Sequence, residues 1–265
     1  MAYAKKNFCA NMVLIYPELT HSRIMSYICD LKTNNKMKKT DFIVIICVIL
    51  FLAPFFLIPE VYGFYKTFNA DHPMLMAFIK FGLLSTFGEC IGLRITAGVY
   101  NRKGFGILPR ALVWGVLGMG ISMAMTIFST GTPAFLASLG MADAPLYAGM
   151  ALSWKKVLVA LCISVAMNTI FAPVFMTLHK VTDTHIEQTG GTLKGFFTHR
   201  LRMGEILTNL NWKRQWGFVF KKTIPFFWYP AHTITFLLPG DLRVLFAALL
   251  GVALGILLAL GAQKK

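Results

Sequence analysis

The stretch Leu242–Leu260, LRVLFAALLGVALGILLAL, decides the class of fold. Its only charged side chain is Arg243, at the start of the stretch. A helix of about 20 residues crosses the roughly 30 Å hydrocarbon core of a bilayer at 1.5 Å per residue. The stretch therefore predicts a transmembrane helix.

Four further blocks have a similar length and apolar character. We expect each to form a helix that crosses the membrane, with Gly131-Thr132-Pro133 ending the third. The first block is too long for the apolar core of a typical signal peptide and lacks an A-x-A site, so it predicts an uncleaved anchor. The blocks are Phe42–Ile58, Met74–Thr96, Ile107–Phe128 and Trp154–Leu178.

A shorter apolar block covers residues 223–238 and contains Pro225 and Pro230. As a helix it would reach only about 24 Å, which predicts a proline-broken or re-entrant segment surrounded by protein. The fold class expected is therefore all-α, a polytopic transmembrane bundle of five or six membrane segments.

The composition agrees with a membrane protein. The chain has 56% hydrophobic and 14% charged residues, against about 25% charged in soluble domains. Its net charge of +15 comes from Lys and Arg placed mostly between the apolar blocks. We expect these to contact anionic lipid headgroups rather than nucleic acid, and their alternation places the N-terminus in the cytoplasm.

The chain divides into three parts. Residues 1–36 are predicted to be a poorly structured extension, and residues 37–64 an extra anchor helix. Residues 65–265 are predicted to form the main helix bundle. Met37-Lys38-Lys39 is typical of a bacterial translation start. The extension is then either an upstream addition or a disordered cytoplasmic arm.

Residues 179–222 are polar and basic and predict a soluble loop, with a surface helix over 212–222 at the membrane interface. The histidines and acidic residues of this region match no metal-helix spacing, and we assign them to solvated loop. They are His179, His185, Glu187, His199 and Glu205. The five cysteines contain no C-x-x-C pair. We expect no metal, no cofactor and no catalytic residues, and therefore no enzyme.

Small residues recur at helical spacing in two of the blocks. Such faces allow close helix packing in lipid. We expect packing within one chain, with a homo-oligomer as the alternative. The stripes contain Gly82, Gly88 and Gly92 in one block and Ala247, Gly251, Gly255 and Ala259 in the last.

Glu89 lies in the middle of the second apolar block. A carboxylate within a span is costly and normally has a partner in the bundle interior. The partner is Asn168, His232 or a basic residue near a helix end. We predict one interior polar site built from Glu89, Asn168, Trp228 and His232. Its carboxylate is either pore-lining or a structural hydrogen-bond anchor.

From His72 onward the chain resembles the Mpv-seventeen family, which includes the twenty-two-kilodalton peroxisomal membrane protein. Two short motifs carry the resemblance. One is a His-Pro pair before a helix that reaches Gly-Glu. The other is a C-terminal series of aromatic, proline and polar residues that ends with an arginine at the start of the last apolar helix. The residues are His72-Pro73, Gly88-Glu89, Trp212, Trp228-Tyr229-Pro230, His232, Thr235-Phe236, Pro239 and Arg243.

The chain departs from the family pattern at several positions. A residue separates Trp228 from Pro230, and His232 and Thr235 stand where Gln and Asn are usual. The resemblance implies an all-helical bundle in a divergent bacterial member, located in the cytoplasmic membrane. It also implies a channel or permeation protein for small solutes. A structural or partner-binding membrane protein without a conducted solute is the alternative.

Overall fold

The computed structural model describes residues 37–263, and the predicted extension 1–36 lies outside the described residues. The described chain is all-α and contains no strand. Its helices are α3 (Lys39–Leu57), α4 (Pro59–Asp71), α5 (Pro73–Ala97), α6 (Ile107–Ser138), η2 (Ala144–Gly149), α7 (Trp154–Gln188), α8 (Leu193–Thr198), α9 (Met203–Thr208), α10 (Trp212–Arg214), η3 (Gln215–Trp228), α11 (Tyr229–Leu237) and α12 (Gly240–Gln263).

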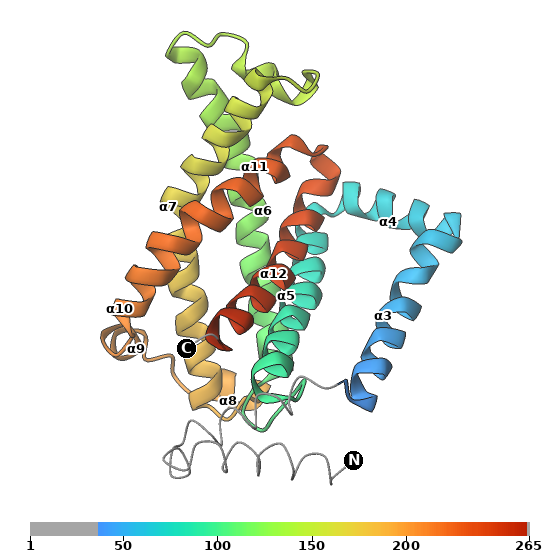
Figure 1. Cartoon of the computed structure of the whole chain (residues 1–265), viewed down its shortest axis with the longest axis vertical. Helices are drawn as coiled ribbons and strands as arrows, with labels where there is room; N and C mark the ends of the chain where they lie inside the picture. Colours follow the sequence, from blue (N-terminus) through green and yellow to red (C-terminus); the bar gives the residue numbers. More distant parts are fainter. Residues whose placement is uncertain (1–36, 264–265) are drawn as a thin grey trace, which may run out of the picture.

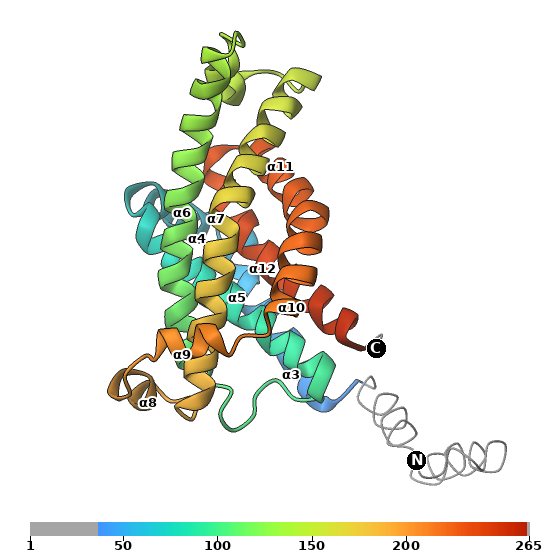
Figure 2. The same cartoon turned by 90° about the vertical axis from the view of Figure 1, so that its left-hand side faces the viewer.

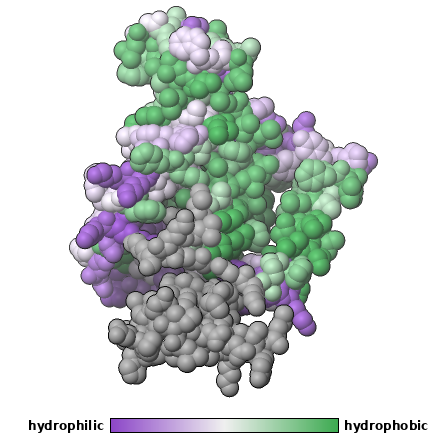
Figure 3. All heavy atoms as spheres, in the orientation of Figure 1, coloured by the Kyte–Doolittle hydropathy of each residue, from purple (hydrophilic) through white to green (hydrophobic). Residues whose placement is uncertain are grey.

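Four of these helices, α3, α5, α6 and α7, are long and apolar enough to cross a membrane. The large apolar side chains on the surface agree with this assignment. Figure 3 shows hydrophobic residues over α3 and much of the visible bundle, and hydrophilic residues near α9 and α10. Such a surface requires a lipid environment. The chain is therefore a multi-pass integral membrane protein in contact with a lipid bilayer.

Helices α6 and α7 are longer than the sequence predicted. Helix α6 continues through Pro133 to Ser138, and α7 continues ten residues past Leu178 to Gln188. They are about 48 and 52 Å long at 1.5 Å per residue. Both exceed the thickness of the hydrocarbon core, and together they project beyond the rest of the bundle at the η2 end (Figures 1 and 2). The assignment of residues 179–188 to a loop was therefore wrong.

The segment 212–237 also differs from the prediction. Residues 212–222 and 223–237 form one helical run, because the backbone stays helical from α10 through η3 into α11. The element η3 has π-helical geometry and accommodates Pro225. Pro230 lies at the junction of η3 and α11. Because the run is continuous there, its missing N–H leaves a carbonyl of the preceding turn without that helical donor. The run packs along α7 (Figure 1).

The centre of the bundle is α5, which packs between α6 and α12. A Cβ added at Gly88 would lie 2.7 Å from the Cα of Val252, and one at Gly255 would lie 2.6 Å from the carbonyl oxygen of Gly88. Gly82 faces α6 instead, with Ala111 as its nearest neighbour. The two predicted stripes thus lie at contacts within the chain.

Helix α3 stands apart from this bundle (Figure 1). Only 6% of its most apolar window is buried, compared with 44% for α5. Helix α4 connects it to α5, so the predicted boundary between residues 64 and 65 falls inside a helix. At the other end of α3, buried Asp41 pairs with Arg94 at 2.5 Å, and Lys38 Nζ donates to the carbonyl of Gly98.

Candidate functional site

The start of α6 and the end of α7 bring polar side chains together against Glu89 of α5. Arg110 lies in the first turn of α6, and Trp114 follows one turn later on the same face. His179, Asp183 and Glu187 recur every four residues on α7 and form a second polar face. We call Glu89, Arg110, Trp114, His179 and Asp183 the Arg110 cluster.

Arg110 is the main partner of Glu89. Its Nη1 lies 2.5 Å from Glu89 Oε2 and 2.5 Å from Asp183 Oδ1, and its Nη2 lies 3.0 Å from Glu187 Oε1. Its Nε donates to the carbonyl of Phe105 at 2.7 Å. The Arg110 side chain is only 4% exposed, so its charge must be compensated by these acceptors.

The second oxygen of Glu89 has its own donors. Trp114 Nε1 donates to Oε1 at 2.8 Å, and His179 Nε2 lies 3.1 Å from the same oxygen. The His179 ring packs on the Trp114 indole with 4.3 Å between centroids. The carboxylate therefore joins α5, α6 and α7 in one network, which is the arrangement expected of an interhelical anchor.

The cluster contains a grouping of metal-ligand type. Ligand atoms of Glu89, His179 and Asp183 lie within 4.8 Å of one another. The guanidinium of Arg110, however, contacts both carboxylates. A divalent cation placed there would be repelled by that buried charge. Arg110 thus already supplies the positive charge that a metal would bring.

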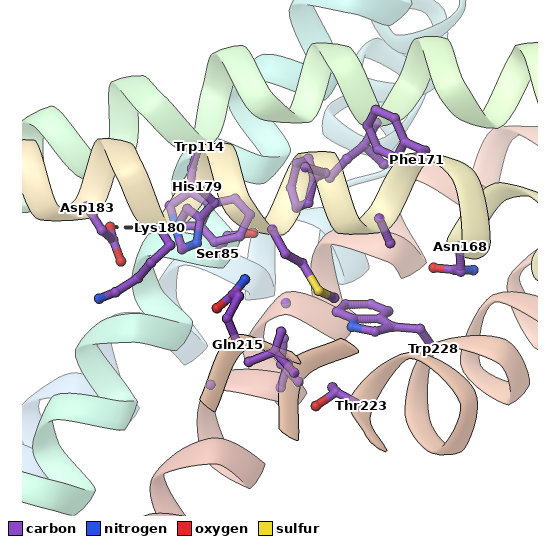
Figure 4. Close-up of a pocket in the computed structure, with 18 of the residues that line it drawn as sticks. Ser85, Trp114, Asn168, Phe171, His179, Lys180, Asp183, Gln215, Thr223 and Trp228 are labelled. Atoms are coloured by element: carbon purple, nitrogen blue, oxygen red, sulfur yellow. Dashed lines mark ion pairs between the residues drawn. The ribbon is translucent and has the colours of Figure 1, made fainter. Parts of the chain in front are cut away.

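Beside the cluster lies a cavity of about 440 Å³, which we call the central cavity. Its walls come from α5, α6, α7, the 210–232 segment and α12. Glu89, His179 and Asp183 line it, and so do aromatic side chains such as Phe171. Figure 4 shows His179 and Asp183 toward one end of α7 and Phe171 further along the same helix. The volume lies in the range of small-molecule sites, about 300–1,000 Å³.

All four residues of the predicted polar site line the central cavity. The predicted hydrogen bonds to Glu89 from the other three are absent among the described residues. Asn168 instead donates to the carbonyl of Ser164 at 2.8 Å. The ring of His232 stacks on Trp228 at 5.1 Å and 13°. Asn168, Trp228 and His232 thus share a cavity with Glu89 and do not compensate its charge.

Sequence reasoning allowed a basic residue near a helix end as the partner of Glu89, and Arg110 is such a residue. It did not single out Arg110, Trp114, His179 or Asp183. One signal was present, because His179, Asp183 and Glu187 keep helical spacing inside a region that we assigned to a loop. Continuing the helix past Leu178 would have placed all three on one face. The pairing of Arg110 with Glu89 depends on how α5 and α6 pack, for which the sequence holds no local signal.

The chain was compared with known protein families, curated proteins and solved structures. No protein family, curated protein or solved structure matches this chain.

Proposed function

We propose that this protein is a permeation protein for small solutes, and that its central cavity is the place where a solute binds during passage. The supporting observation is the cavity itself, which lies inside a membrane bundle and combines polar and apolar walls. Three of its residues, Ser85, Gln215 and Trp228, carry buried donor groups without a hydrogen-bond partner in the described chain. Unsatisfied groups of this kind are costly unless a ligand or water completes them.

The setting proposed is a bacterial cytoplasmic membrane with the N-terminus in the cytoplasm. Lys38 lies beside the end of α5, where it contacts Gly98, close in sequence to Arg102 and Lys103. Basic residues of the α7–α9 region lie at the same end in Figure 1. One basic end agrees with the positive-inside rule. Six crossings, by α3, α5, α6, α7, the 212–237 run and α12, complete this topology.

Membership of the Mpv-seventeen family is part of the same proposal. It rests on the short motifs around His72 and Trp228, and the helical bundle is compatible with it.

The test is solute flux into liposomes that contain the purified protein, measured for small neutral, anionic and cationic solutes. Val219 lines the cavity from η3, so Val219→Trp should fill the space and reduce flux to the level of empty liposomes. Val174→Trp is the matched control, because Val174 is 68% exposed on α7 and does not line the cavity. Flux equal to empty liposomes for every solute with the native protein would refute permeation.

A second candidate is a structural membrane protein without a conducted solute. The engagement of Glu89 by Arg110, Trp114 and His179 favours it, because the carboxylate has the partners of an anchor. Flux and Glu89→Gln together separate the two functions. A structural protein should show no flux, and Glu89→Gln should mainly lower its thermal stability. A permeation protein should show flux, and Glu89→Gln should change its cation preference or pH dependence.

A further inference from the structure

The two carboxylates that line the central cavity already have a cationic partner. Glu89 and Asp183 line the cavity, and both lie 2.5 Å from Arg110. Glu89 also accepts from Trp114 at 2.8 Å. A solute that enters the cavity therefore finds a Glu89 carboxylate whose two oxygens both have donors.

Three other polar groups of the cavity wall have no hydrogen-bond partner in the part of the chain that the structure describes, and all three can donate a hydrogen bond. The Ser85 hydroxyl, the Gln215 amide nitrogen and the Trp228 indole nitrogen have no hydrogen-bond partner within residues 37–263. Ser85 is 1% and Gln215 8% exposed. Figure 4 shows Gln215 and Trp228 projecting from η3 into the space between η3 and α7. Amide and indole N–H groups only donate, so the missing partner is a hydrogen-bond acceptor.

Two cationic side chains that are exposed on the protein surface also line the cavity. Lys180 of α7 and Arg214 of α10 are both exposed. Neither forms an ion pair with a carboxylate in the described part of the chain, although Lys180 lies in the field of Asp183. By contrast, the nearby exposed Arg202, which does not line the cavity, pairs with Glu205 at 3.0 Å. The cavity thus offers unpaired positive charge to a solute.

The rest of the wall suits an apolar body. Phe81, Phe171 and Phe175 line it. The Trp228 indole, stacked on His232, adds a flat aromatic surface. Aromatic walls favour apolar and ring-containing ligands.

We infer that the central cavity binds an amphipathic organic anion, a small molecule with an apolar body and a carboxylate-type head group. The head group accepts a hydrogen bond from Gln215 and faces Lys180 and Arg214, whose side chains line the same cavity. The body lies against Phe171 and its aromatic neighbours. This assignment rests on the proposed use of the cavity as a solute site, and it specifies the class of solute.

The first test compares probes that differ only in head-group charge. Binding of 3-phenylpropionate, 3-phenylpropan-1-ol and 3-phenylpropylammonium is measured by equilibrium dialysis against the full-length protein in lipid nanodiscs, with empty nanodiscs as the blank. The anion should bind more tightly than either of the other two. Equal binding of all three, or tighter binding of the cation, would overturn the inference without any need for a variant.

The second test removes the cations. Lys180→Ala with Arg214→Ala should weaken 3-phenylpropionate binding about fivefold, since two exposed charges are removed. The matched control is Lys213→Ala with Lys222→Ala, which removes the same net charge from exposed residues that do not line the cavity. Equal loss in both double variants would assign the effect to overall charge and overturn the inference.

The third test removes the donor next to the cations. Gln215→Leu should weaken binding of the anion about fivefold by loss of one hydrogen bond, and it should weaken binding of the uncharged 3-phenylpropan-1-ol less. Unchanged binding of the anion would contradict the assigned head-group position. Binding of the anion without flux of any solute would refute permeation and leave this inference intact, whereas flux without preference for anions at the binding step would refute the inference alone.

Discussion

At the scale of single residues, Arg110 organises the interior of the protein. Its guanidinium contacts Glu89 of α5 and Asp183 and Glu187 of α7, and it lies over the Phe105 ring at 4.5 Å. Three helices therefore converge on one side chain. Breaking a buried ion pair from one side leaves an uncompensated charge, which costs more than the pair contributes.

The first prediction follows from this cost of leaving a buried charge without its partner. Arg110→Met should lower the free energy of unfolding by about 3–5 kcal/mol, because Glu89 and Asp183 lose their shared partner. The measurement is the thermal unfolding midpoint in detergent. Glu89→Gln should cost less, because Asp183 keeps Arg110.

Arg202→Met is the matched control for this prediction. Arg202 pairs with Glu205, but the pair is 66% and 53% exposed, so its loss should cost less than about 1 kcal/mol. If Arg110→Met does not accumulate, Arg110→Lys tests the same point, because it retains the charge and loses the planar fork. An unfolding midpoint for Arg110→Met equal to that of Arg202→Met would contradict the role of Arg110.

The sequence could predict that Glu89 needs an interior partner, but not which one. Its cost in a span follows from its charge and its position among apolar residues. The identity of the partner depends on the rotation of α5 against α6, which brings Arg110 within 2.5 Å. The expected donors His232 and Trp228 line the same cavity but stack on each other.

At the scale of elements, the apolar blocks predicted where helices exist better than where they end. The start of α5 at Pro73 follows from its proline, and its end follows from Gly98, whose φ of 75° suits glycine. Helix α7 continued past the predicted end because residues 179–188 keep a helical period with polar residues. Polarity indicated a loop there, whereas the packing of that polar face on α6 stabilises a helix.

The second prediction concerns the contact between α5 and α12. Gly88→Ala should lower stability by about 1–3 kcal/mol, the cost typical of overpacking, since the new Cβ would lie 2.7 Å from the Cα of Val252. Backbone atoms cannot move aside as a flexible side chain can. The measurement is again the thermal midpoint in detergent.

Gly120→Ala is the control for Gly88→Ala. Gly120 lies inside α6, and a Cβ there would have no atom within 4 Å. Its substitution should leave stability unchanged or raise it slightly, because alanine favours a helix more than glycine does. If both alanines had the same effect, close packing at Gly88 would not be what holds the two helices together.

At the scale of the whole molecule, the proposed orientation in the membrane rests on the distribution of charge between its two ends. Lys38 contacts the carbonyl of Gly98, so the start of α3 and the end of α5 lie together. The η2 tip lies at the opposite end (Figure 1) and carries exposed apolar side chains such as Leu146 and Leu152. The η2 end also carries Lys155, which pairs with Asp143, and Lys156, so its two lysines are the exception to the proposed charge pattern.

The third prediction tests this orientation by cysteine labelling. In a chain with its native cysteines replaced, Lys103→Cys should react with an impermeant maleimide only after the cells are permeabilised. Leu146→Cys, on the 69% exposed Leu146 of the η2 tip, should react in intact spheroplasts. The reversed pattern would place the basic end outside.

The ion pair between α3 and α5 has a consequence for how the two helices enter the membrane during synthesis. Its buried Asp41 pairs with Arg94, which follows 53 residues later in the chain. Helix α3 packs little against the bundle, so it can leave the translocon as a single segment. Its carboxylate then has no counterion until α5 has been synthesised and inserted. Asp41 lies in the first turn of α3, where a side chain can stay at the headgroup level during that interval. The ion pair forms when α5 arrives, and it then fixes the start of α3 against the end of α5.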